Sequence, residues 1–248
     1  MTLSSAFVRF RSPGESRTKG VFMPVPSPFH ERIVARATSH EWREWAGYLA
    51  PALYGATHEY EYYAIRNAAA LIDISPLYKY AIRGPDAAAL LDRIVTRDIG
   101  RCKVGRVRYT PWCDEAGKVL DDGTVARLAP DHFRVTAADP NFRYFEDCAY
   151  GFDAEVEDIS EQLAALALQG PRSRAILEEV VHGVAFHRLP FFHLAEGTIG
   201  AYAVTVTRTG YTGDLGYELW FERKWATYVW DILIEVGERH GITPTGLV

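Results

Sequence analysis

The segments YAIRGPD at residues 80–86 and LALQGPR at residues 166–172 share one design. Each is a short apolar run that ends at a Gly-Pro pair. Proline suits the first turn of a helix, because its missing N–H would be unpaired there anyway. Apolar residues at helical spacing follow both pairs: Leu90, Leu91, Ile94 and Val95, and then Ile176, Leu177, Val180 and Val181. Two such strand–helix units are too few for a solenoid and favour two related lobes.

The rest of the chain has a mixed pattern. Strands are expected at 106–112, 118–120, 124–128, 133–137, 199–208 and 217–221, and helices at 59–71 and 224–240. The sequence thus predicts an α+β fold with two related lobes of antiparallel sheet and packed helices. Residues 1–28, rich in Pro and Gly, would form an irregular leader. Residues 74–158 would form one lobe, and 29–73 plus 159–248 a discontinuous second lobe.

Composition excludes several classes of protein. The formal net charge of -5 gives no broad positive field, so binding of nucleic acid is not expected. There is no run of roughly 18 apolar residues that could span a bilayer, and no apolar core of a secretory signal. The three cysteines and eight histidines lack the spacing of disulfide frameworks or metal sites. We expect a cytoplasmic, metal-free protein that contacts neither nucleic acid nor membrane.

Two polar segments are candidates for chemistry. Asp121 and Asp122 precede Gly123, and Asp-Gly is a common turn pair, so both carboxylates could simply serve a hairpin turn. The functional alternative is a carboxylate directed into a pocket, where it could take up a proton or stabilise a cation. The glycine-rich segment 208–218 contains Tyr211 and ends at Glu218. It fits either a tight loop or a backbone that approaches a flat ligand closely.

Five segments in order resemble the aminomethyltransferase family, which includes the T-protein of the glycine cleavage system and folate-dependent demethylases. They are RNAAALIDIS at 66–75, RGPD at 83–86, YTPWCDEAGKVLDD at 109–122, LQGP at 168–171 and TGYTGDLGYE at 209–218. The resemblance implies a tetrahydrofolate-dependent aminomethyl- or methyltransferase. It implies that Asp121 is the catalytic carboxylate, that Glu218 binds the pterin, and that Tyr211 and Tyr109 lie in the folate pocket.

The sequence also departs from the family pattern. Gly117-Lys118-Val119 replaces the family's Gly-Gly-Ile, and Ser75-Pro76-Leu77 replaces its Ser-His-Met. These changes favour a small-molecule one-carbon donor other than that of glycine cleavage, such as a methylated amine, ether or sulfur compound.

The chain stops at Val248, where the family's next motif would begin, so we expect it to lack the family's C-terminal barrel. A lipoyl carrier protein or a separate C-terminal polypeptide are the partners that the resemblance implies. A folate-binding module without transfer activity and an inactive fragment are the alternative functions.

Overall fold

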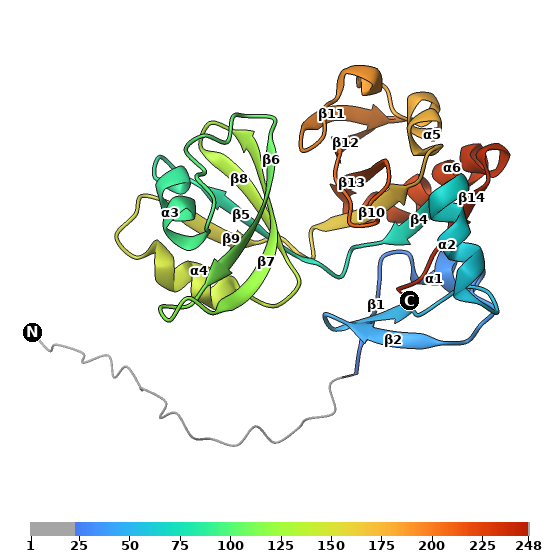
Figure 1. Ribbon diagram of the computed structural model, residues 1–248, viewed down its shortest axis with the longest axis horizontal. Helices are drawn as coiled ribbons and strands as arrows, with labels where there is room; N and C mark the ends of the chain where they lie inside the picture. Colours follow the sequence, from blue (N-terminus) through green and yellow to red (C-terminus); the bar gives the residue numbers. More distant parts are fainter. Residues whose placement is uncertain (1–22, 248) are drawn as a thin grey trace, which may run out of the picture.

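The computed structural model describes residues 23–247 and has an α+β fold (Figure 1). The two larger sheets have six and five strands, and Figure 1 shows the five-stranded sheet on the left and the six-stranded sheet on the right. Strand pairing in both is antiparallel, except that β14 runs parallel to β4. The predicted α+β class with antiparallel sheets and packed helices is therefore confirmed.

Within residues 23–247 the strands form three sheets. In spatial order, the six-stranded sheet contains β11 (Leu194–Ile199), β12 (Tyr202–Thr207), β13 (Gly216–Glu222), β10 (Leu163–Gln169), β4 (Ala69–Asp73) and β14 (Ile242–Pro244). The five-stranded sheet contains, again in spatial order, β6 (Val107–Cys113), β7 (Val119–Ala129), β8 (His132–Ala137), β5 (Tyr78–Arg83) and β9 (Glu155–Asp158). The small sheet contains β1 (Val25–Pro26), β3 (Tyr48–Pro51) and β2 (Trp42–Trp45).

The α-helices are α1 (His30–Val34), α2 (His58–Asn67), α3 (Ala87–Ile94), α4 (Phe142–Ala149), α5 (Ser173–Val180) and α6 (Ala226–Gly237). Most of the predicted leader, residues 1–22, lies outside the described residues, and β1 falls in its last part. The division of the chain into lobes at residues 73 and 159 remains a prediction.

The two Gly-Pro units have the predicted form. The first is β5 followed by α3, and the second is β10 followed by α5. Gly84 and Gly170, which join strand to helix, have φ values of 131° and 117°, a region that favours glycine. Each strand lies between two antiparallel neighbours, β5 between β8 and β9, and β10 between β13 and β4. The same local sequence therefore forms the interior of a sheet twice.

Each large sheet has one face covered by helices. Apolar residues of α3 and α4 pack on the five-stranded sheet, and those of α1, α5 and α6 pack on the six-stranded sheet. In β10 the alternation is clear, because Leu166 and Leu168 join the helix-covered core while Ala165 and Ala167 face the opposite side with Trp220. The sheet faces not covered by helices are therefore left to form a site.

Two predicted elements differ from the structure. The helix expected at 59–71 ends at Asn67, and 69–73 is the buried strand β4, because Leu71 pairs with Leu168 on one side and Pro244 on the other. A short apolar run buried on both faces looks alike in a strand and a helix. The strand expected at 199–208 is found as the shorter β12, which pairs through a turn at Gly200 with β11, a strand that was not expected.

The turn expected at Asp121-Asp122-Gly123 is also absent, since these residues lie within the continuous strand β7. Gly123 is needed there for a different reason. A Cβ on Gly123 would lie 1.8 Å from the Thr136 carbonyl oxygen of the neighbouring strand β8. The glycine therefore permits close strand approach rather than a turn.

Candidate active site

A cavity of about 460 Å³ lies between the two large sheets. Both sheets contribute side chains to its wall, as does the loop before β13. Three of the four site residues predicted from the sequence line it, namely Tyr109, Tyr211 and Glu218. The remaining wall includes Leu77, Asp122, Thr124, Thr136, Phe192, Thr209, Gly210 and Trp220. The volume and mixed lining suit a small organic ligand.

Glu218 lies on β13 and is 9% exposed. Its Oε2 accepts hydrogen bonds from the hydroxyl of Thr209 at 2.7 Å and the hydroxyl of Thr207 at 3.2 Å. Its Oε1 accepts none from the described residues. Burial raises the pKa of the Glu218 carboxyl, while the two threonines and the charge of Arg134 act against that shift. One carboxylate oxygen is thus fixed, and the other remains free to accept from a ligand.

Asp122 and Tyr109 form the opposite wall, on β7 and β6. Both are exposed, so their polar atoms are accessible from the cavity. Interaction with the Asp122 carboxylate raises the pKa of the Tyr109 hydroxyl. In the sequence, Asp122 is a candidate beside Asp121, but the family resemblance implies Asp121 as the catalytic residue.

Asp121 has very different surroundings. It is 8% exposed, and its carboxylate accepts hydrogen bonds from the backbone N–H of Asp122 at 2.8 Å, the backbone N–H of Asp139 at 3.0 Å and Asn141 Nδ2 at 2.8 Å. Asn141 Oδ1 in turn accepts from Trp112 Nε1 at 3.0 Å. Consecutive residues of a strand point to opposite faces. Asp121 therefore points toward the helix-covered core, and Asp122 toward the cavity.

A second cavity of about 490 Å³ adjoins the first, because Tyr211 lines both. Its other wall residues include Trp45, Ile65 and Leu247, with Arg43 and Glu44 from β2. Tyr211 is 65% exposed, so its ring separates two accessible spaces.

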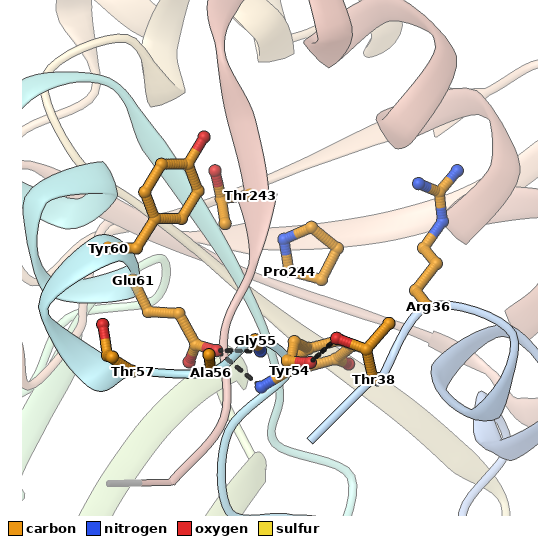
Figure 2. Close-up of a pocket in the computed structure, with 10 residues that line it drawn as sticks. All are labelled: Arg36, Thr38, Tyr54, Gly55, Ala56, Thr57, Tyr60, Glu61, Thr243 and Pro244. Atoms are coloured by element: carbon orange, nitrogen blue, oxygen red, sulfur yellow. Dashed lines mark hydrogen bonds between the residues drawn. The ribbon is translucent and has the colours of Figure 1, made fainter. Parts of the chain in front are cut away.

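Another cavity, of about 600 Å³, contains none of the predicted site residues (Figure 2). Its carboxylate, Glu61, is occupied: Oε1 accepts from the backbone N–H groups of Tyr54 and Gly55, and Oε2 accepts from that of Gly246 at 2.7 Å. In Figure 2 the Arg36 guanidinium points away from Glu61. Glu61 therefore holds two loops together, and we place the candidate site in the cavity between the sheets.

Within residues 23–247, no three His, Cys, Asp or Glu side chains are grouped so that they could hold a metal ion. The same part of the chain contains no helix with the length and apolar character needed to cross a membrane.

Known proteins resemble this chain over most of its length. Trimethylamine-oxide aldolase of Ruegeria pomeroyi is 38% identical over 236 residues, which are 91% of this chain and 30% of that protein. Aminomethyltransferase of Halothermothrix orenii is 38% identical over 208 residues, which are 82% of this chain and 57% of that protein. The crystal structure of glycine cleavage system aminomethyltransferase T from Bartonella henselae superimposes with a TM-score of 0.80 at 28% identity, covering 90% of this chain and 60% of that one.

The chain thus spans about half the length of the aminomethyltransferases that it matches. The sequence profile described as the GCVT N-terminal domain matches residues 29–248, nearly the whole described chain. The order of motifs, the fold and this match agree, and the chain belongs to the GCVT N-terminal domain family.

Proposed function

We propose that this chain binds tetrahydrofolate in the cavity between the two sheets and takes part in one-carbon transfer from a small-molecule donor. The observation that supports this most is convergence. Tyr109 and Asp122 from one sheet line a single cavity together with Glu218 of the other sheet and Tyr211 of the loop before it, although the two pairs are far apart in sequence. The family and the relatives named above favour the same chemistry.

The cavity wall suits a flat heterocycle with several N–H donors. Tyr109, Tyr211, Phe192 and Trp220 provide aromatic surface on which such a ring can stack. Glu218 Oε1 is free to accept from the ring edge, and a charge-assisted hydrogen bond of this kind is stronger than a neutral one. We therefore assign Glu218 to pterin binding, and Tyr211 and Tyr109 to aromatic contact.

We assign the chemical step to Asp122 rather than Asp121. Tetrahydrofolate, when bound, would supply the nitrogen that accepts the one-carbon unit. Asp122 is the exposed carboxylate of the cavity, where it can take up a proton or stabilise a developing cation. Asp121 already accepts three hydrogen bonds on the other side of the strand, and so its role is to hold β7 in place.

The donor is proposed to be a methylated amine, ether or sulfur compound. Leu77, at the position where the family pattern has Met, lines the cavity, so the wall differs where a donor would enter. The trimethylamine-oxide aldolase relative favours the amine among these classes. A lipoyl carrier protein or a separate C-terminal polypeptide are proposed partners, and the cytoplasm is the proposed location.

Calorimetric titration of tetrahydrofolate, followed by single-turnover transfer from trimethylamine N-oxide or dimethylamine, tests this function. We expect wild type to bind and transfer, Asp122→Asn to bind without transfer, and Glu218→Gln to bind more weakly. Binding without transfer from either donor in wild type would favour the alternative of a folate-binding module. Absence of binding in a folded chain would reject the folate assignment.

A further inference from the structure

Arg134 on β8 is a buried arginine, only 4% exposed. Its Nε has no hydrogen-bond acceptor among the described residues. Burial lowers the pKa of its guanidinium to about 10, so the group stays positive near neutral pH. A buried cation is costly unless other groups stabilise it. The groups around Arg134 are therefore expected to stabilise its charge.

The first of these neighbours is Trp220 of the other sheet. The Arg134 guanidinium carbon lies 4.2 Å from the centroid of the Trp220 ring, which is within the range of a cation–π contact. Trp220 lines the cavity between the sheets, whereas Arg134 does not. Arg134 therefore packs against Trp220, a residue of the cavity wall, without lining the cavity itself.

The second neighbour is the Glu218 carboxylate. The charges of Arg134 and Glu218 act on each other, and each favours the ionised form of its partner. Hydrogen bonds connect the same groups, since Trp220 Nε1 donates to Thr207 Oγ1 at 3.3 Å and the Thr207 hydroxyl donates to Glu218 Oε2 at 3.2 Å. Arg134 thus reaches Glu218 both through space and through Trp220 and Thr207.

We propose that Arg134 is a positioning residue: its charge stabilises the Glu218 carboxylate, and its stacking fixes Trp220, so that the cavity selects ligand edges that donate N–H groups. This inference rests on the proposed function, because it assigns Glu218 to the pterin. It adds a residue that touches no ligand and lies on the sheet opposite Glu218.

Ligand binding should depend on pH through Arg134. The titratable groups that surround Glu218 are Arg134 from β8, Asp122 from β7, Tyr109 from β6 and Tyr211 from the preceding loop, while Glu196 from β11 acts on Arg134. Arg134 is the cation of this set. Its removal should raise the pKa of Glu218, so that Glu218 is protonated, and ligand binding is lost, at a higher pH than in wild type.

Arg134→Met removes the charge and keeps an apolar side chain of similar length, which buried sites often tolerate. Arg134→Lys retains the charge. Arg127→Met is a matched control, because Arg127 lies in the same sheet and stacks on Phe133 at 5.0 Å without lining the cavity. If Arg134→Met does not fold, the uncharged Arg134→Gln replaces it.

The first measurement needs no ligand. The pKa of Glu218 is followed by carbon-13 NMR of labelled glutamate carboxyls, with the signal assigned by Glu218→Gln. We expect a rise of about one unit, a tenfold change in the protonation equilibrium, in Arg134→Met. Arg134→Lys and Arg127→Met should remain close to wild type. An unchanged value in folded Arg134→Met, or an equal rise in Arg134→Lys, would overturn the proposal.

The second measurement is tetrahydrofolate affinity against pH. In Arg134→Met the midpoint of affinity loss should move to higher pH by the same amount, whereas general loosening of the fold would weaken binding at every pH. If wild type binds no folate but the Glu218 pKa still moves, the proposed function fails and the electrostatic role of Arg134 stands. If folate binds and the Glu218 pKa does not move, the proposed function stands and the electrostatic role of Arg134 is rejected.

Discussion

Asp121 and Glu218 are both buried carboxylates, and each lies on an interior strand of one large sheet. The Asp121 carboxylate accepts three hydrogen bonds from N–H groups of its own sheet and the following loop. At Glu218 only Oε2 is held, by two threonine hydroxyls, and the residue lines the cavity. A buried carboxylate whose acceptors are all used stabilises the fold. One with a free oxygen at a cavity is available to a ligand.

Neither of these two carboxylates is expected to act as the proton acceptor. We expect that role for Asp122, the exposed carboxylate of the cavity. Asp122→Asn should lower the single-turnover rate by about 10²- to 10⁴-fold, the usual contribution of a general acid or base. Tetrahydrofolate affinity should stay within about threefold of wild type, because Glu218 is untouched. Full activity in Asp122→Asn, together with loss of activity in stably folded Asp121→Asn, would restore Asp121 as the catalytic residue.

Asp121→Asn should chiefly reduce stability. The new amide would place N–H groups against N–H donors, so the free energy of unfolding should fall by about 3 kcal/mol. Urea denaturation followed by tryptophan fluorescence measures this change. Asp114→Asn is the control, because Asp114 accepts two backbone N–H groups in an exposed turn and should matter less. Equal midpoints for the two variants would contradict the structural role of Asp121.

Glu218→Gln should instead reduce tetrahydrofolate affinity more than stability. Removing the charge weakens hydrogen bonds to the ligand edge, so tetrahydrofolate affinity should fall by about 2 kcal/mol, roughly 30-fold. Stability should change less than affinity: one costly buried charge is removed, but the buried Arg134 cation loses the carboxylate that stabilises it. Calorimetry and urea denaturation on the same preparation test both halves. A large loss of stability at unchanged affinity would show that Glu218 resembles Asp121 after all.

The smallest effect is expected for Thr209→Val. The Thr209 hydroxyl lies 2.7 Å from Glu218 Oε2, and losing this donor leaves the carboxylate less firmly oriented. We expect a loss of about 1 kcal/mol in folate binding, roughly fivefold. Calorimetric titration of the variant measures it. Affinity equal to wild type would mean that Thr207 alone is sufficient to orient Glu218.

Much of this architecture could be predicted from the sequence, because local sequence patterns mark several of its strands and helices. The Gly-Pro pairs at 84–85 and 170–171 each require a strand, a break and a helix, and the structure has both. The C-terminal helix was expected at 224–240, and α6 with its flanking 3₁₀ turns spans Arg223 to His240. The helix expected at 59–71 failed after Asn67, because strand pairing with β10 outweighed local periodicity there.

The candidate site was only partly readable. The amino-acid sequence was enough to indicate the family, the set of polar and aromatic candidates, and the Asp pair before Gly123. Which aspartate faces the cavity depends on strand pairing, because a shift of one residue in register moves every side chain to the opposite face of the sheet. In β7, pairing with β6 and β8 sets that register. Arg134 was likewise invisible beforehand, since its contact with Trp220 exists only once the two sheets meet.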